Sequence, residues 1–145
     1  MTAPPEARRT RENVENDVNS LFLVLGLVSL IVGAIGIANV TLVTVLERVG
    51  EIGLRRALGA RTHHIATQFL VESTTTGVIG GIVGASAGTI IVVAVAVARD
   101  WTPVMDMWTA LVSPVAGGMI GLLAGVYPAM RAASMEPVEA LRTGT

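Results

Sequence analysis

The sequence contains no cysteine and no lysine, and each absence excludes a class of chemistry for this chain. Without cysteine it has no disulfide, no zinc–thiolate site, no thiol nucleophile and no cysteine-bound iron–sulfur cluster. Without lysine it lacks the phosphate-binding side chain of a Walker A loop. The chain is therefore not, by itself, a conventional P-loop ATPase.

Charged and aromatic residues are also scarce. Only 14% of the 145 residues are charged and 3% are aromatic, whereas 52% are apolar, which is unusual for a water-soluble domain. Glycine, alanine and valine dominate instead, and small residues suit helices that pack closely in lipid. The net charge of −1, without a basic stripe and interleaved aromatics, argues against a nucleic-acid partner.

Three long runs contain no Asp, Glu, Arg or His, namely Leu21–Leu46, Ser73–Ala98 and Met107–Met130. Each run exceeds the roughly 20 residues that a helix needs to cross a bilayer. The first run is too long for the apolar region of a signal peptide, and its preceding flank mixes Glu with Arg. We therefore expect an all-α fold, an integral membrane helical bundle with three transmembrane helices at residues 21–46, 73–98 and 107–130.

Arginine positions predict the orientation of these spans. The segment 47–72 holds four arginines and the tail 131–145 holds two, whereas the loop 99–106 sets one arginine against two aspartates. Because arginine-rich loops stay in the cytoplasm, we expect 47–72 and 131–145 on the cytoplasmic side. The loop 99–106 and the segment 1–20 are then expected outside. The three arginines in 1–20 oppose this placement. The chain would be a multi-pass protein of the cell (plasma or inner) membrane with its amino terminus outside and its carboxy terminus cytoplasmic. Carrying the polar segment 1–20 across would require a membrane segment upstream.

The second and third spans carry glycines four residues apart, a spacing that places them in ridges along one side of a helix. Such small-xxx-small ridges let helix backbones approach closely, and association in lipid relies on contact packing. The predicted helix-packing residues are Gly77, Gly80, Gly81, Gly84 and Gly88 in the second span and Gly117, Gly121 and Gly125 in the third. The alternative is that these glycines reflect composition alone.

Two further residues within the spans carry structural predictions. Pro114 removes one backbone donor from the third span, so a kink or a locally opened turn is expected there. Asn39 is the single amide side chain inside a span, and a buried amide in lipid usually bonds a neighbouring helix. We therefore expect Asn39 to join helices and not to serve directly in transport.

The segment 47–72 between the first two spans predicts a short helix followed by a long one. Glu51 and Arg55 stand four residues apart, in the order that stabilises a helix, and Gly59 is well placed to end it. A second helix is expected to start near Thr62 and to continue into the second span as one rod. The short helix is amphipathic, so it either lies along the membrane surface or docks on a protein partner.

Candidate catalytic and metal-binding residues are few. His63 and His64 are adjacent, but neighbouring helical residues point about 100° apart, and no nearby Cys or Asp completes a ligand set. The spans themselves offer no Asp, Glu, His or Cys as a base or nucleophile. We expect two solvated histidines and no catalytic, cofactor or metal site, so the chain is not expected to be an enzyme.

Two motifs frame the region from Leu21 to Arg142. The first joins Gly33-Ala-Ile-Gly-Ile-Ala-Asn39 to Leu46-Glu-Arg-Val-Gly-Glu-Ile-Gly-Leu-Arg-Arg-Ala-Leu-Gly-Ala-Arg61, and the second is Tyr127-Pro-Ala-Met-Arg-Ala-Ala-Ser-Met-Glu-Pro-Val-Glu-Ala-Leu-Arg142. Both resemble motifs of FtsX/MacB-like ABC transporter permeases. The resemblance implies a four-span subunit with a large extracytoplasmic domain after its first span. This chain would hold the carboxy-terminal three-span part, with residues 2–20 as the end of that domain and the first span absent.

The same resemblance implies a partner for the segment from Glu47 to Arg61, which would be the coupling helix seated in a groove of a separate ABC ATPase subunit. The expected docking residues are Ile52, Leu54 and Leu58, which would fill an apolar groove, and Arg55 and Arg56, which would pair with carboxylates. ATP would bind to that subunit, so this chain would need no cofactor. A second permease subunit would complete the transporter, and span movements would couple ATP hydrolysis to export or extracytoplasmic work, a mechanism called mechanotransmission.

The competing interpretation is a stand-alone helical membrane scaffold, or a truncated permease remnant, that self-associates through its glycine ridges without an ATPase. A short helix resting on anionic headgroups would share the amphipathicity of a docking helix. The sequence leaves open which substrate is moved, and whether the permease is a homodimer or a heterodimer. It also leaves open whether the chain is a fragment, a split gene product or functional alone.

Overall fold

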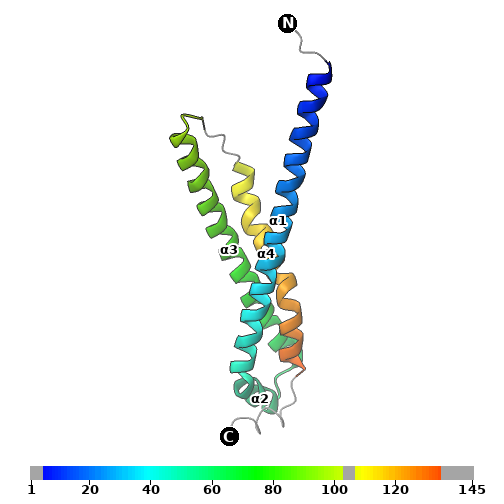
Figure 1. Ribbon diagram of the computed structural model, residues 1–145. Coiled ribbons are helices and arrows are strands. Elements are labelled where there is room, and N and C mark those ends of the chain that lie inside the picture. The colour runs from blue at the N-terminus through cyan, green and yellow to red at the C-terminus, as the bar shows by residue number, and fades with distance from the viewer. Residues whose placement is uncertain (1–4, 103–106, 135–145) are drawn as a thin grey trace. The chain divides into compact units, whose positions relative to one another are not determined.

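The computed structural model describes residues 5–102 and 107–134, and all regular structure in these ranges is helical. The helices follow one another as α1 (Pro5–Glu47), α2 (Val49–Ala57), α3 (Thr62–Ala98) and α4 (Met107–Ala133) (Figure 1). The all-α prediction is confirmed. α1, α3 and α4 are each long and apolar enough to cross a membrane, in agreement with the three predicted spans. The ends of the chain, including Arg142, and the second half of the loop 99–106 lie outside the described residues.

The chain divides into two compact units, Met1–Gly33 and Ala34–Thr145, and the boundary falls inside α1. In the first unit α1 begins at Pro5, well before the apolar run, because proline suits the first helical position and the Arg and Glu residues that follow are good helix formers. Its apolar side chains are exposed, with Leu21 at 70% and Leu23 at 68%. In a membrane span such side chains meet lipid tails instead of water.

In the second unit, α2 and the start of α3 form the predicted pair of helices. α2 contains the ion pair between Glu51 and Arg55, which confirms the expected i,i+4 contact. Gly59 follows with a φ of 97°, a left-handed conformation that glycine adopts without strain, and it ends the helix as predicted. α3 begins at Thr62 and continues unbroken to Ala98 as one rod, also as predicted.

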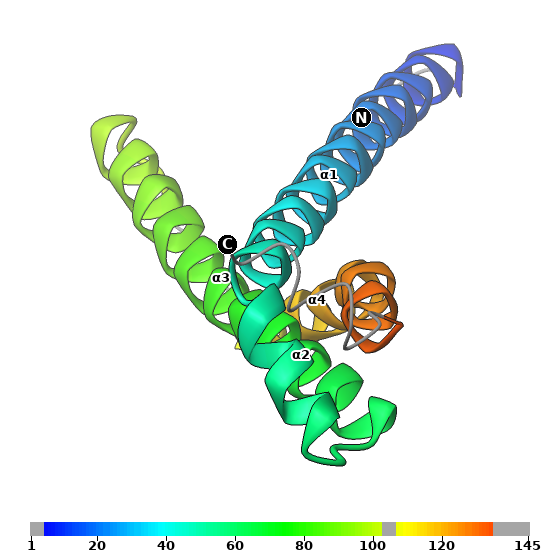
Figure 2. The same cartoon turned by 90° about the horizontal axis from the view of Figure 1, so that it is seen from below.

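α3 and α4 run antiparallel and side by side in the second unit (Figure 1). α4 continues through Pro114 and Pro128 without a break in the helix, and a bend at Pro114 stays a prediction. α2 lies at the end of this pair where α3 starts and α4 finishes (Figure 2). It is hydrogen-bonded there to both long helices.

Candidate functional site

Four helices meet in a cluster of buried apolar side chains beside α2, which we call the junction. It consists of Val45 from α1, Ile52 from α2, Ile65 and Phe69 from α3, and Ala129 and Ala132 from α4. The helical spacings of three and four residues within α3 and α4 place each pair on one face. Phe69 is 2% exposed and Val45 is fully buried, so the junction is closed to solvent. The junction therefore fixes α2 to the end of the bundle.

The burial of Ile52 corrects one sequence-based assignment. This side chain was expected to fill an apolar groove of an ATPase, but it is only 3% exposed and belongs to the junction. Its apolar surface is already covered by the chain's own helices, so it has no surface left for a partner. Ile52 holds α2 in place and does not form part of the docking surface.

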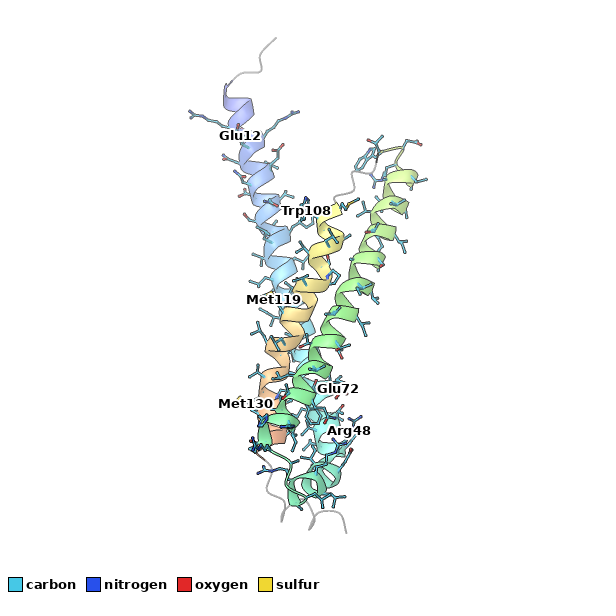
Figure 3. The ribbon with its side chains drawn as sticks, turned by 180° about the vertical axis from the view of Figure 1, so that it is seen from behind. Glu12, Arg48, Glu72, Trp108, Met119 and Met130 are labelled. Carbon is cyan, nitrogen blue, oxygen red and sulfur yellow. The ribbon has the colours of Figure 1, made fainter. Side chains whose placement is uncertain are left out.

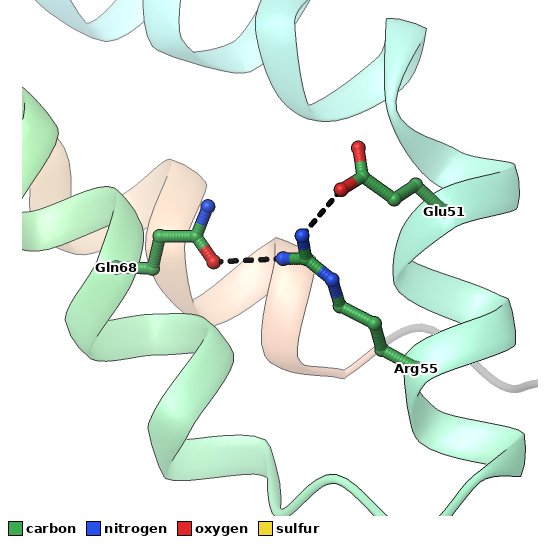
Figure 4. A network of polar contacts seen from close by, with 3 residues as sticks. All are labelled: Glu51, Arg55 and Gln68. Atoms are coloured by element: carbon green, nitrogen blue, oxygen red, sulfur yellow. Dashed lines mark hydrogen bonds and ion pairs between the residues drawn. The ribbon is translucent and has the colours of Figure 1, made fainter.

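Arg55 connects α2 to the beginning of α3 (Figure 4). Its Nη1 donates a hydrogen bond of 3.0 Å to Gln68 Oε1, and its Nη2 forms the ion pair with Glu51. The side chain stays 48% exposed, so the guanidinium can still meet a carboxylate of a partner. The sequence did not single out Gln68, because an isolated glutamine on a long helix carries no recognisable motif.

Arg56 connects α2 to the end of α4. Its Nη1 donates a hydrogen bond of 2.7 Å to the carbonyl oxygen of Ala133, the last residue of α4. The carbonyls of a final helical turn have no partner within the helix, and a cation there also complements the helix dipole. Arg56 thus makes a contact within the chain and is partly buried at the end of α4, and its predicted pairing with an ATPase carboxylate stays a prediction.

Leu54 and Leu58 are the two predicted docking residues that α2 turns outward. They are 53% and 80% exposed, and they stand four residues apart on one side of the helix, with the exposed Ala57 between them. We call these three residues the outer face of α2. Leu58 directly follows the last residue of α2 and is strongly exposed. Exposure of an apolar side chain to water is unfavourable, so covering it with a partner would release free energy. The outer face is the part of α2 that a partner could cover.

The predicted glycine ridges divide into two groups. Gly77 and Gly81 of α3 lie against α4 so closely that a Cβ at either position would overlap the carbonyl oxygens of Gly117 and Ser113, respectively. Gly121 and Gly125 of α4 are equally close to Ser73. By contrast, Gly80, Gly84 and Gly88 face open space in the described part of the chain. The sequence also missed Gly118, which is buried beside Val78.

The polar contact between α1 and α3 involves hydroxyls and not the predicted amide. Thr41 Oγ1 and Ser73 Oγ lie 3.2 Å apart, and whichever hydroxyl donates to the other gives up its bond to the backbone carbonyl four residues earlier, Ile37 O or Phe69 O. Both residues are buried, at 8% and 1% exposed. Asn39 is exposed and makes no side-chain hydrogen bond within the described ranges, so its predicted role in joining helices stays a prediction. The reason for this exposure is angular, because two residues along a helix turn the side chain by about 200°, away from the side that Thr41 presents to α3.

His63 and His64 are exposed at the start of α3, with ring centroids 4.1 Å apart and ring planes inclined by 57°. Across residues 5–102 and 107–134, no three His, Asp or Glu side chains gather into a possible metal site. The described histidines thus lie in solvent beside α2, outside the junction.

Comparisons with known proteins place this geometry in a family context. Residues 23–137 match the FtsX-like permease C-terminal family. The macrolide export ATP-binding/permease protein MacB of Rhodopirellula baltica is 40% identical over 137 residues, covering 94% of this chain and 20% of the relative. The probable syringafactin export ATP-binding/permease protein SyfD of Pseudomonas syringae is 39% identical over 134 residues, covering 90% and 20%. The uncharacterized ABC transporter permease YknZ of Bacillus subtilis is 43% identical over 116 residues, covering 79% and 29%.

The chain spans about a fifth of the length of the two export relatives and less than a third of YknZ. The family match begins within α1 and extends past the end of α4, so it includes α2, the junction and the close contact of α3 with α4. Because the match covers well over half of the 145 residues, this chain belongs to the FtsX-like permease family, of which it carries the C-terminal part.

Proposed function

We propose that this chain is the membrane part of an ABC transporter permease that couples ATP hydrolysis, carried out by a separate ABC ATPase subunit, to export or extracytoplasmic work. ATP binds to the ATPase, and the chain itself needs no cofactor. A second permease subunit, identical or related, completes the transporter. The family match supports the permease role, and the names of two relatives, MacB and SyfD, which describe ATP-binding/permease proteins, support an association with ATP binding.

The observation that carries the proposal is that the two sides of α2 make different contacts. One side of the helix is anchored, with Ile52 in the junction, Arg55 bonded to Gln68 and Arg56 bonded to the end of α4. The opposite side presents the outer face to solvent. A push on the outer face would reach both long helices of the pair directly, because each is hydrogen-bonded to α2. This is the arrangement that transmission of force from an ATPase into membrane spans requires.

The outer face also gives the proposed contact its chemistry. Exposed Leu54 and Leu58 fit an apolar groove, and the half-exposed guanidinium of Arg55 lies beside them for a carboxylate at the rim of that groove. Charged groups at an interface rim favour encounter and register more than affinity, so the leucines should dominate the binding energy. The proposed topology places this face in the cytoplasm with the ATPase, with the amino terminus outside.

The test is direct docking of an ABC ATPase subunit from the same organism, coexpressed with the chain and copurified in detergent. Leu58→Asp should abolish copurification, whereas the matched variant Leu58→Met, which keeps an apolar side chain of similar volume, should retain it. Arg55→Glu is a less suitable change by itself, since it also sets a negative charge beside Glu51. Unchanged copurification of both Leu58→Asp and the double variant Leu54→Asp with Leu58→Asp would contradict the proposed docking face.

The alternative of a stand-alone membrane scaffold makes the opposite prediction. A scaffold would keep its oligomeric state and bind no ATPase, whatever residue stands at position 58. Labelling of a cysteine introduced at Ala57 adds an independent check of orientation, because the proposal requires it to react with a membrane-impermeant thiol reagent from the cytoplasmic side only. Reaction from the exterior would exclude an ATPase at this face.

A further inference from the structure

A cleft of about 210 Å³ lies between the final part of α1 and the first half of α3. The outer face of α2 does not line it. Its polar lining is Thr41, Thr44, Glu72 and Thr76, and its apolar lining includes Ile37 and Val40. All of these residues belong to the second unit, so the cleft is built within one compact body. Neither the docking of an ATPase nor the close contact of α3 with α4 uses this cleft.

Glu72 is the unusual residue of the cleft. It is the single acidic residue of α3, and it directly precedes the run from Ser73 to Ala98, which contains no charge. Its carboxylate has no hydrogen-bond or ion-pair partner among the residues that the structure describes. Glu72 is exposed at the edge of a membrane span, where its carboxylate can reach the polar groups of the bilayer surface.

The hydroxyl groups around Glu72 do not supply that partner. Thr44 Oγ1 donates to the carbonyl of Val40 at 3.0 Å, and Thr76 Oγ1 donates to the carbonyl of Glu72 at 2.9 Å. A threonine hydroxyl has one hydrogen to donate and two lone pairs to accept, so these hydroxyls are left with acceptors alone. The cleft thus presents acceptors and a negative charge. A ligand that fits it must be a cation with several hydrogen-bond donors.

The position of the cleft relative to the bilayer indicates which kind of cation it could bind. Glu72 stands at the end of a span and Thr44 lies one turn before Arg48, whose backbone N–H donates to Thr44 O at 3.2 Å, so the cleft is at headgroup level. Figure 3 labels Glu72 and Arg48 at this same end of the helices. Arg48 lies outside the cleft lining, just beyond it along the chain, and its exposed guanidinium at this depth suits a lipid phosphate. An ammonium at Glu72 and a phosphate at Arg48 together describe a zwitterionic headgroup.

We propose that the cleft binds the primary ammonium of an aminophospholipid such as phosphatidylethanolamine. Glu72 neutralises the ammonium, Thr44 and Thr76 accept its remaining hydrogens, and Arg48 binds the phosphate. Ile37 and Val40 contact the apolar part of the lipid next to its headgroup. This lipid fills the space between α1 and α3, where the described contact consists of side chains such as Thr41 and Ser73. The site is independent of ATPase docking, since the outer face of α2 contributes no residue to it.

The test compares two lipids that differ only at the amine. The full chain is placed in nanodiscs of equimolar phosphatidylethanolamine and phosphatidylcholine with identical acyl chains, and the lipids retained after mild detergent extraction are counted by native mass spectrometry. Phosphatidylcholine carries the same charges but has no N–H donor. Retention of phosphatidylethanolamine should exceed that of phosphatidylcholine about tenfold, the effect of one charge-assisted hydrogen bond. Equal retention of the two lipids by the wild-type chain overturns the proposal.

Variants locate the preference in the cleft. Glu72→Gln keeps the shape of the side chain but removes its charge, and it should bring the retention ratio to about one, because the ion pair between the carboxylate and the ammonium is lost. Glu47→Gln removes an acidic charge from the same end of α1 outside the cleft lining and should leave the preference unchanged. A preference that survives Glu72→Gln contradicts the proposal. If Glu72→Gln loses helicity, Thr44→Val with Thr76→Val provides the test, and an undiminished preference in that pair contradicts it equally.

A final arm distinguishes a lipid from a soluble amine. Soluble phosphoethanolamine is added at millimolar concentration to nanodiscs that contain both lipids. Unchanged retention of phosphatidylethanolamine supports a lipid, because the acyl chains hold the headgroup at the cleft at high effective concentration. Displacement of the lipid by the soluble compound overturns the lipid assignment and indicates a site for free amines.

Discussion

α3 carries two glycine stripes that look alike in sequence and behave differently in the structure. Gly77 and Gly81 lie against α4 with backbone touching backbone, whereas Gly80, Gly84 and Gly88 face open space in the described ranges. Both stripes have the small-xxx-small spacing that permits close approach of helices. The difference shows that this spacing identifies faces that are able to pack closely, but does not identify which face is used.

The partner helix explains the choice between the two stripes. α4 offers Gly117 and Gly121 at the same four-residue spacing, and the antiparallel pairing brings them to Gly77, while Gly81 meets Ser113 and Pro114. Close backbone contact needs small residues on both helices at the same level, and α4 provides them for one stripe only. By contrast, α1 contacts α3 through side chains, with Thr41 hydrogen-bonded to Ser73 and Val45 in the junction. α3 is thus held by backbone contact on one side and by side-chain contact on the other.

The largest expected effect on stability comes from placing a side chain on the glycine stripe that contacts α4. In Gly77→Val, the new side chain would overlap the carbonyl of Gly117, which is backbone and cannot move aside without separating the helices. Overpacking of this kind should reduce the free energy of unfolding by about 3 kcal/mol. Unfolding by sodium dodecyl sulfate in mixed micelles, followed by circular dichroism, measures the change. Gly80→Val makes the same substitution one turn away on the open stripe and serves as the control.

A distance measurement gives the same comparison a structural readout. Spin labels on α3 and α4, at exposed positions such as Val83 and Leu122, should move apart in Gly77→Val and keep their distance in Gly80→Val. An equal loss of stability in both variants would mean that the valine side chain destabilises the helix itself. The contrast between the two stripes would then be without energetic consequence.

A smaller effect is expected at the end of α4, where a side chain and not the backbone makes the contact. Arg56→Ala removes the hydrogen bond to Ala133 O and should reduce the free energy of unfolding by about 1.5 kcal/mol, the range for a bond with a charged donor. Hydrogen exchange should rise in the last turn of α4 and remain unchanged at the centre of the contact between α3 and α4. Arg56→Lys, which keeps the charge but not the planar fork, should recover part of the loss.

The sequence predicted the helices well because their signals are local. Three runs without charge, the pair of Glu51 and Arg55, and Gly59 each act within a few residues, and each was found where expected. The faces of α2 were harder to predict. Ile52, Leu54 and Leu58 are all apolar residues of one short helix, and only the junction shows that Ile52 points inward. Hydrophobic character alone cannot separate the chain's own core from a surface awaiting a partner.

Polar contacts between helices were beyond prediction for a related reason. Asn39 was expected to join helices because it is the single amide side chain in a span, whereas Thr41 and Ser73 form the described polar contact between α1 and α3. Which residue faces a neighbouring helix depends on the rotation of α1 about its axis, and the apolar residues all round that helix leave the rotation unspecified. Likewise, the pairing of Arg55 with Gln68 depends on the turn at Gly59, which brings together residues 13 positions apart.

The contact between Thr41 and Ser73 allows a modest test of the side-chain attachment of α1. Ser73→Ala removes the contact with Thr41 and the bond to the carbonyl of Phe69 while keeping Cβ beside Gly125, so only one atom is lost from the packing against α4. Hydrogen bonds between helices in lipid contribute about 0.6 kcal/mol on average, and a loss of this size is expected in mixed-micelle unfolding. Thr41→Val should cost a similar amount, and the two changes together should cost no more than either alone. Strict additivity would mean that the hydroxyls do not interact.

The smallest expected effect, and one of opposite sign, is at the open stripe. In Gly84→Ala the added Cβ meets nothing within 4 Å, so no contact opposes it. Glycine in the middle of a helix is less favourable than alanine by about 0.5–1 kcal/mol, and a gain approaching that amount is expected for the isolated chain. A loss of stability that grows with protein concentration would show that this stripe is covered by another copy of the chain, since an added side chain harms only an interface that is already close. Unfolding measured at two protein-to-detergent ratios separates these outcomes. A gain in the free energy of unfolding that does not depend on concentration means that the stripe is a free surface. A loss that depends on concentration means that it is a second closely packed glycine interface, equivalent to the contact between α3 and α4.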